Sequence, residues 1–463
     1  MFLLVFLGAL VTIVMGLSVK GVLAVKKSQY QLTNGEFGVT LALMLLLVIP
    51  LTSWVGVQVA IHNQVSFNEN WNGWETGAEL VPEDCQEDGL MRHYWIETRK
   101  EWKDVDEEYT DKNGEKRTRT VRKLVDVDHK IPYTKVEWTF VVHTTLGDVT
   151  IADRNLPENP NAYRFRWGVA VPDYPDTGYP EFWLQVRDRI NANKPGPVTF
   201  RRQYDNYILA SQHTILSRYS GAIDRYNKDH LLPAINSRIE HVYLSNRTYF
   251  VGVSPSGDWY NAINRFDAAL GSTLQGDLHL VIVSTDKVKD KDEYGFALMA
   301  YWQSEKNFDK DALSKNAIVV ILGTSDGKTV AWARAYTGMP MGNEGMVIDI
   351  QNQLPGTALT PQAILGSPYA SLNGKGGVTV TNTDGALERI IWGPHAFKRV
   401  HMHSNTGQGA GYEYLLRELV PSTGQLIGIL VVLTLFAGGA WGLAVYAGPD
   451  IYAAIRERLG KRR

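Results

Sequence analysis

Three long runs without a charged residue, at the two ends of the 463-residue chain, constrain its fold more than any other feature. They are residues 2–19, 37–61 and 426–447. A helix needs about 20 apolar residues to cross a bilayer core, and a central charge costs roughly 2.5 to 3.5 kcal/mol. We therefore expect three transmembrane helices, with Pro50 tolerated as a kink in the second. The first run lacks a preceding basic residue, which favours a retained span over the alternative of a cleaved signal peptide.

The basic residues beside these runs predict their orientation. Lys20, Lys26 and Lys27 lie between the first two runs, and five more basic residues lie within 456–463. Because such residues stay on the cytoplasmic side, both segments are expected in the cytoplasm. The N-terminus and residues 62–422 are then extracytoplasmic, in a multi-pass integral membrane protein with a cytoplasmic C-terminal tail. If the first run were cleaved and the basic residues did not set the orientation, the large region could instead be cytoplasmic.

Composition excludes several other classes of protein. The single cysteine, Cys85, rules out a disulfide within the chain and a zinc ribbon of the CxxC type. The net charge of −2 gives no sign of the basic surface that nucleic-acid binding requires. The membrane is therefore an expected partner, and nucleic acid is not.

Residues 62–160 are expected to form a β-rich extracytoplasmic module. Asn113-Gly114 between β-compatible runs predicts a hairpin, and a second strand pair should turn at residues 146–148. Residues 161–239 are interpreted as a helical linker region, because apolar residues from Ile208 to Tyr226 recur at helical spacing.

Residues 240–422 alternate strand and helix patterns, which predicts an α/β sandwich with a mainly parallel sheet. Strands are expected over 241–253, 277–285 and 318–322, and residues 329–336 should return as an antiparallel edge. The first helix should be capped by Ser256 and end at Gly271. A glycine-rich excursion then precedes the last region, 423–463, which comprises the third transmembrane helix and the basic tail. Residues 1–61 form the two-helix region with a short basic loop.

Acidic residues follow the predicted strands, where ligands bind in open parallel sheets. We take Asp326, Glu344 and Asp349 as candidate metal ligands, because calcium is bound by six to eight oxygen ligands. Two other interpretations stay open. Asp326-Gly327 is also an ordinary hairpin turn, and Glu344 also suits a helix N-terminus. The spacing of the residues indicates no catalytic constellation.

Part of this region resembles the TPM-domain family, over about residues 255–355. The resemblance rests on four segments: a hydrophobic strand after Asn316, then 326–328 (Asp-Gly-Lys), 336–338 (Tyr-Thr-Gly) and 344–349 (Glu-Gly-x-x-x-Asp). Two features differ from the family pattern. An alanine follows Asn316, and residues 339–343 lengthen the segment before Glu344. The family implies an extracytoplasmic α/β sandwich, often membrane-tethered, with calcium binding in some members and acid phosphatase activity proposed for a few.

Two functions from different classes are compatible with these patterns. The first is a membrane-anchored extracytoplasmic TPM-like protein that acts as a calcium-dependent binding or assembly module in the cell envelope, with a protein partner. The alternative is a cation-dependent phosphatase acting outside the cytoplasm. A channel or transporter is disfavoured by only three spans without an intramembrane charge. Gly438, Gly439 and Gly442 would permit homo-oligomerisation through the transmembrane helices.

Overall fold

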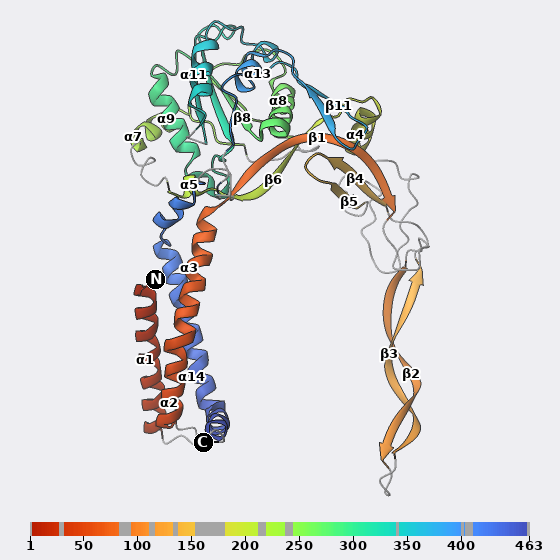
Figure 1. Cartoon of the computed structure of the whole chain (residues 1–463), viewed down its shortest axis with the longest axis vertical. Helices are drawn as coiled ribbons and strands as arrows, with labels where there is room; N and C mark the ends of the chain where they lie inside the picture. Colours follow the sequence, from red (N-terminus) through yellow and green to blue (C-terminus); the bar gives the residue numbers. More distant parts are fainter. Residues whose placement is uncertain are drawn as a thin grey trace.

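A computed structural model shows a helical bundle, an α/β domain beyond one end of it, and an arched sheet that extends sideways (Figure 1). The structure describes most of the chain. The described residues are 2–26, 32–82, 94–110, 116–132, 138–152, 181–211, 219–236, 244–338, 342–399, 402 and 411–460.

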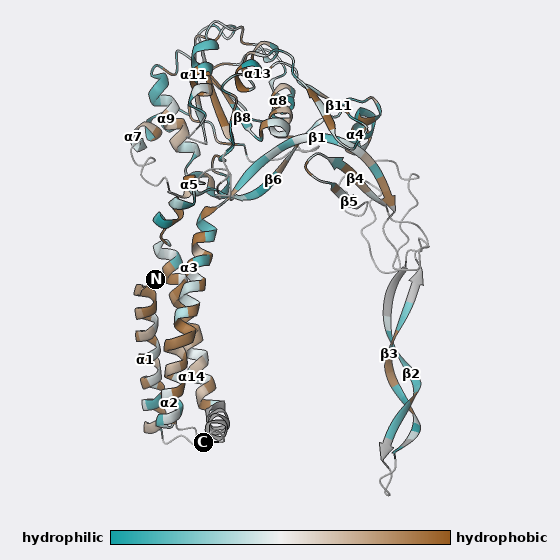
Figure 2. Ribbon diagram, viewed as in Figure 1, coloured by the Kyte–Doolittle hydropathy of each residue, from teal (hydrophilic) through white to brown (hydrophobic). Residues whose placement is uncertain are grey.

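The bundle confirms three helices that are long and apolar enough to cross a membrane. Figure 2 shows them as the most continuously hydrophobic helices of the chain. The second span has a π-helical turn just before Pro50, which accommodates a residue that cannot donate a backbone hydrogen bond. The helices are α1 (Phe2–Val25), α2 (Asn34–Leu43) continued by the π-helix (Met44–Val48) and α3 (Ile49–Val65), and α14 (Thr423–Gly460).

The spans pack closely inside the bundle. The indole of Trp441 donates a hydrogen bond of 3.0 Å to the carbonyl of Thr12, and a Cβ at Gly16 would lie 2.3 Å from that indole. A glycine is therefore required where α1 meets α14. A Cβ at Gly439 or Gly442 would meet nothing within 4 Å, so both positions are open. Homo-oligomerisation through these helices stays a prediction.

Both the start of α1 and the α/β domain lie at the same end of the bundle, and α14 ends at the other (Figure 1). The multi-pass topology that the basic segments predict stays a prediction. Which end faces the cytoplasm is not set by the fold, so the extracytoplasmic location of residues 62–422 stays a prediction.

Strand β1 (Ser66–Pro82) follows α3 directly and forms the arched sheet. Its first half pairs with β6 (Pro197–Asp205) and its second half with β4 (Trp138–Thr144), which pairs with β5 (Val149–Ala152). All three pairings are antiparallel, and the order is β5-β4-β1-β6.

The turn between β4 and β5 falls where Leu146-Gly147-Asp148 predicts it. Strand β6, however, lies in the region interpreted as helical. That region also holds α4 (Glu181–Asn191), α5 (Tyr207–Ser211) and α7 (Ser220–Lys228). The helical pattern thus describes the short helices but misses a strand that pairs with a partner far away in the sequence.

The predicted long hairpin is present as β2 (Tyr94–Thr110) and β3 (Lys116–Pro132), which pair antiparallel along their whole length. The Asn113-Gly114 turn itself lies outside the described residues. This hairpin is a separate two-stranded sheet and projects away from the arched sheet (Figure 1).

The α/β domain has the expected sheet, with two parallel pairings and one antiparallel edge. Its strand order is β10-β9-β8-β7. The strands are β7 (Thr248–Val251), β8 (Asp277–Ser284), β9 (Ala317–Thr324) and β10 (Trp332–Thr337). The mixed α/β class is therefore confirmed.

Both faces of this sheet are covered. Leu280 and Val320 pack toward α8, α11, α12 and α13, whereas Val281 and Val319 pack toward α7 and α9. This burial on both sides explains why the strands are continuous apolar runs. The covering helices are α8 (Trp259–Leu274), α9 (Lys291–Trp302), α11 (Glu344–Gln353), α12 (Pro361–Leu365) and α13 (Ala386–Ile391).

Helix α8 differs at both ends from its prediction. Its N-cap is Asp258, whose side chain accepts from the backbone of Asn261, whereas the carbonyl of Ser256 accepts from the indole of Trp259. The helix continues past Gly271 to Leu274. Gly271 has a different role, because a Cβ there would lie 2.3 Å from the carbonyl oxygen of Asn72 on β1.

The glycine-rich excursion forms a small antiparallel hairpin of β11 (Tyr369–Leu372) and β12 (Val378–Thr381). Gly374 and Gly376 in its turn have positive φ angles of 70° and 76°, which explains the local need for glycine. This hairpin packs beside α8, close to β1.

Candidate functional site

The amino ends of the parallel strands meet β1, and buried charged residues gather there. Arg247 directly precedes β7, Asp277 is the first residue of β8, and Asn316 directly precedes β9. The side chains of Arg247 and Asp277 are fully buried, with no exposed surface. Burying a charge is costly unless it is paired and hydrogen-bonded, so the surroundings of Arg247 determine whether this junction is stable.

Arg247 joins the α/β domain to the arched sheet. Its Nε lies 2.8 Å from Oδ1 of Asp277, and its Nη1 lies 3.3 Å from Oδ2 of Asp267 on α8. Its Nη2 donates to Oδ1 of Asn72 at 3.0 Å and to Oγ1 of Thr199 at 3.3 Å. One guanidinium therefore links β7, β8 and α8 to β1 and β6. We call these five residues the junction cluster.

The pKa values of the two carboxylates of the junction cluster are shifted in opposite directions. Burial raises the pKa of Asp267 well above its usual value, although Arg247 opposes the shift. Burial would also raise the pKa of Asp277, but Arg247 and His279 outweigh it and lower that pKa to about 2. Asp277 additionally accepts from Asn72 at 2.9 Å. The negative charge that balances Arg247 is therefore placed on Asp277.

A second set of buried charges lies around Glu69 on β1. Its Oε1 lies 3.6 Å from Nζ of Lys315 and its Oε2 lies 3.3 Å from Nη2 of Arg399. The ammonium of Lys315 also lies 3.0 Å from the ring centroid of Tyr204. Burial lowers the pKa of Lys315 to about 7, with Arg399 acting in the same direction and Glu69 against it.

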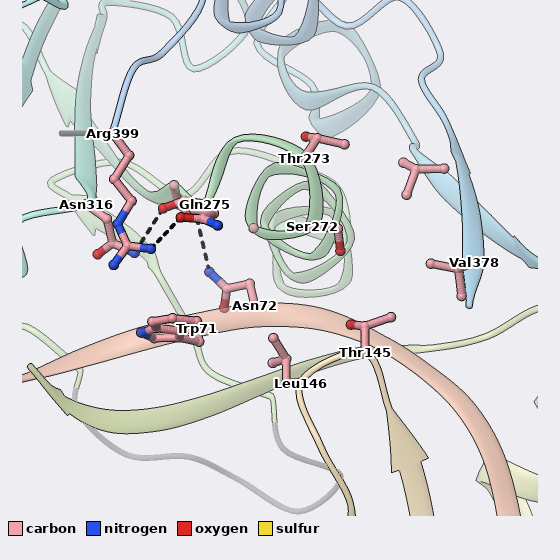
Figure 3. A pocket seen from close by; sticks show the side chains of 13 residues that line it. Trp71, Asn72, Thr145, Leu146, Ser272, Thr273, Gln275, Asn316, Val378 and Arg399 are labelled. Carbon is pink, nitrogen blue, oxygen red and sulfur yellow. Dashed lines mark hydrogen bonds between the residues drawn. The ribbon is translucent and has the colours of Figure 1, made fainter. Parts of the chain in front are cut away.

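A cavity of about 490 Å³ lies between β1, the end of α8 and the β11–β12 hairpin. Figure 3 shows Trp71 and Asn72 on one side and Gln275, Asn316 and Arg399 on the other. We call this the junction pocket. Its lining residues are Trp71, Asn72, Thr145, Leu146, Gly271, Ser272, Thr273, Gln275, Gly276, Asn316, Val378, Val380 and Arg399.

The chemistry of this lining suits binding. It offers amides, hydroxyls, two valines and one guanidinium, and none of the described lining residues is an acid, a histidine or a cysteine. Arg399 is held in place because its Nη1 donates to Oε1 of Gln275 at 2.6 Å. Gln275 itself is in the left-handed region, with φ of 58°. The pocket thus holds one guanidinium, paired with Glu69, beside hydrogen-bonding groups.

The predicted metal ligands lie elsewhere. Asp326 closes the turn after β9, where its Oδ1 accepts from the backbone of Lys328 at 2.8 Å and of Thr329 at 2.9 Å. These hydrogen bonds lower the pKa of Asp326 to about 2. The turn interpretation therefore accounts for this residue.

The other two candidates are on α11. Glu344 is its first residue and accepts from the backbone of Gly342 at 2.9 Å, as a helix N-terminus favours. Asp349 lies 2.7 Å from Nδ1 of His395. Within the described residues, no three or more His, Cys, Asp or Glu side chains gather into a group that could hold a metal ion. Calcium binding at Asp326, Glu344 and Asp349 stays a prediction.

Sequence patterns missed the residues of the junction. Asn68, Asn70 and Asn72 alternate along β1 and donate to Asp311 and Asp277 of the α/β domain. Such a repeat of amides at a spacing of two residues is the one signal that could have indicated a polar strand face against another part of the chain.

Comparisons with known proteins do not extend this picture. No protein-family model, curated protein or solved structure matches the chain. The resemblance to the TPM-domain family therefore stays an expectation from the motifs quoted above.

Proposed function

We propose that the protein is a membrane-anchored binding and assembly module of the cell envelope, with its large region outside the cytoplasm. The observation that carries the proposal is the direct passage from the span α3 into β1, to which the α/β domain is locked by buried charges. A module built in this way holds its pocket at a fixed height and angle above the membrane.

The lock has two parts, one on each side of β1. The junction cluster ties Asn72 to Arg247 and Asp277, and the second set ties Glu69 to Lys315 and Arg399. Separation of the domain from β1 would break these buried hydrogen bonds and ion pairs, so we expect the domain to keep one position on β1. This arrangement supports a static, positioned binding surface.

The membrane end of the module is also tied. Gln64 on α3 donates to Oε1 of Gln425 on α14 at 2.8 Å, and Gln425 donates to the carbonyl of Ala60 at 3.2 Å. The second and third spans are therefore linked where they leave the apolar bundle. Force on the α/β domain would reach both spans together.

We assign the partner contact to the junction pocket. Its volume lies within the range of about 300–1,000 Å³ that ligand sites occupy. The exposed side chains of Thr145, Ser272, Thr273 and Gln275 offer hydroxyl and amide groups to the backbone of a peptide segment. The guanidinium of Arg399 suits a carboxylate of that segment. The hydrolase alternative has no comparable support among the lining residues.

In vivo photo-crosslinking tests the proposal. A photoreactive amino acid at Val378 or Leu146, both in the pocket, should give an adduct with a partner protein, whereas the same group at the exposed Ile348 of α11 should not. Arg399→Gln should reduce the adduct, and Arg399→Lys should reduce it less. Equal adducts at all three positions, or none, would contradict the proposal.

The predicted orientation needs its own test. Protease added to spheroplasts should digest residues 62–422 under conditions that leave a cytoplasmic control protein intact. Protection of this region would remove the envelope role. Calcium dependence is tested by titrating calcium into the full-length protein and into the Asp326→Asn/Glu344→Gln/Asp349→Asn variant, and equal heats for both would refute the predicted ligands.

A further inference from the structure

The β2–β3 hairpin is unusual in its length and in its isolation. Each strand has 17 residues, which corresponds to a ribbon about 56 Å long. Within the described residues it is a two-stranded sheet, so both of its outer edges carry unpaired backbone groups.

Such a ribbon lacks a core of its own. Trp102 is 62% exposed and Leu124 is 49% exposed on one face. On the other face, four half-buried valines belong to none of the hydrophobic clusters of the described residues: Val105, Val121, Val125 and Val127. An isolated two-stranded hairpin is at best marginally stable in water. The hairpin therefore needs a neighbour.

The two edges have opposite charge toward the outer half of the hairpin. The β2 stretch 103–108 contains one basic residue, Lys103, and four acids: Asp104, Asp106, Glu107 and Glu108. On β3, residues 116–123 contain five basic residues and no acid. Charges on exposed strands normally prevent edge-to-edge pairing. Here they would oppose the pairing of like edges and favour the pairing of unlike ones.

The charges are only partly neutralised within the hairpin. Glu107 lies 3.3 Å from Arg119 and 3.0 Å from Lys123. Asp104 and Arg122 are direct register partners, yet they form no ion pair in the described structure. Both side chains are exposed. An acid on the β2 edge and a base on the β3 edge thus remain available at the same level.

We propose that hairpins of neighbouring copies of this chain pair edge to edge, with β3 of one copy against β2 of the next. The partner is a second copy because the chain itself provides both complementary edges. Membrane anchoring gives all copies the same orientation, so copies are related by rotation about the membrane normal.

This rotation fixes the sense of the new pairing. Strand β2 of the neighbour runs parallel to β2 of the first copy, and therefore antiparallel to its β3. The result is a continuous antiparallel sheet with Arg122 of one copy level with Asp104 of the next. Contacts of this head-to-tail kind close into rings or extend as filaments.

A two-fold dimer is the competing arrangement. It would place β3 against β3, with basic residues facing basic residues, or β2 against β2, with acids facing acids. Both carry repulsion that the head-to-tail pairing avoids. The proposal goes beyond the function proposed above, because it concerns the hairpin and not the junction pocket.

Disulfide mapping in membranes tests the arrangement. The natural cysteine is removed by Cys85→Ser, and two differently tagged full-length chains carry either Asp104→Cys or Arg122→Cys. When the chains are expressed together, only contact between copies can join the two tags. Mild oxidation should give mainly the 104–122 product, because facing residues of paired strands have Cβ atoms about 4.5–5.5 Å apart.

A depth control uses Glu108→Cys with Arg122→Cys. These positions are four residues out of register, about 13 Å along the strand, which is beyond the reach of a disulfide. We expect at least a several-fold lower yield than for 104–122. Asp104, Glu108 and Arg122 are exposed, so their cysteine variants should fold, and equal expression and elution of the reduced chains checks this.

Each other outcome would overturn the proposal. Dominant 104–104 or 122–122 products, seen as dimers that carry only one kind of tag, would show a two-fold contact. Equal yields at both depths would show random collision. No product between copies, or adducts with another protein only, would show that the hairpin has a different neighbour. Because the pocket crosslinks at Val378 and Leu146 are measured separately, failure here leaves the proposed function untouched.

Discussion

The two ends of the parallel strands in the α/β domain use the same kind of residue in opposite ways. At the amino end, Asp277 is fully buried against Arg247 and joins the domain to β1. At the carboxyl end, Asp326 accepts backbone hydrogen bonds within an exposed turn. An aspartate beside a buried strand can therefore lock one part of the molecule to another or simply close a loop, depending on what faces that end of the sheet.

The difference follows from the order of the chain. Ligands of open α/β sheets usually bind beyond the carboxyl ends of the strands. Here β1, which precedes the domain, crosses at the amino ends and creates both the junction cluster and the junction pocket there. The polarity of the sheet alone therefore does not locate the site in this protein.

The largest expected effect comes from Arg247→Met. The change removes the partner of a buried carboxylate, so the free energy of unfolding should fall by about 3–5 kcal/mol. Denaturant unfolding of the detergent-solubilised full-length chain, followed by tryptophan fluorescence, measures it. Arg334→Met is the matched control, because Arg334 pairs with the exposed Asp292 and should cost at most about 1 kcal/mol. Equal losses would remove the distinction between buried and exposed pairs.

The next largest expected effect is a loss of stability at low pH that is due to Asp277. Its pKa is lowered to about 2 in the folded state, against an ordinary value of 3.8. The stabilisation is therefore complete above about pH 4 and lost as the pH falls toward 2. Asp277→Asn should be less stable than the natural chain at pH 7, with a smaller difference at pH 2. If the stability difference between Asp277→Asn and the natural chain were the same at pH 7 and pH 2, the stabilising negative charge would not be on Asp277.

Asp326→Ala probes the carboxyl end. We expect a fall in melting temperature smaller than that of Arg247→Met, because the exposed carboxylate only orders the turn around Lys328 and Thr329. Scanning calorimetry of the three proteins in one detergent gives the order. A loss as large as that of Arg247→Met would show that the carboxyl end is equally critical to the fold.

Much of the fold follows from local patterns in the sequence. Uncharged runs indicate the three spans, and apolar runs such as 318–322 indicate strands buried on both faces. The Asn113-Gly114 dipeptide predicts the pairing of β2 with β3, because the two strands are neighbours in the sequence. These features depend on residues that are close along the chain, where periodicity carries the information.

The junction depends on contacts that periodicity does not carry. Asn72 and Asp277 are 205 positions apart, and Arg247 is 175 positions from Asn72. Strand β6 was missed for the same reason, because its partner β1 lies more than a hundred residues earlier. In the sequence alone, the two residues of a buried ion pair cannot be distinguished from charged residues on the surface.

A partly exposed histidine–carboxylate contact on β1 is expected to have the smallest effect on stability. His143 on β4 lies 2.9 Å from Asp148 and 3.1 Å from Glu79 on β1, and it is partly exposed. The hydrogen bond to Asp148 raises the pKa of His143, with burial opposing and Glu79 assisting. Because the folded pKa is raised, the stabilisation is complete below about pH 6.5 and lost as the pH rises through the raised value.

His143→Gln should therefore lower the free energy of unfolding by less than about 1 kcal/mol at pH 5.5 and have almost no effect at pH 9. The difference between the two chains at each pH isolates this histidine from the others. The sign is opposite to that of Asp277, whose contribution is lost in acid. If the His143 difference grew with pH, the exposed contact would not be ionic, and only the buried end of β1 would depend on charge.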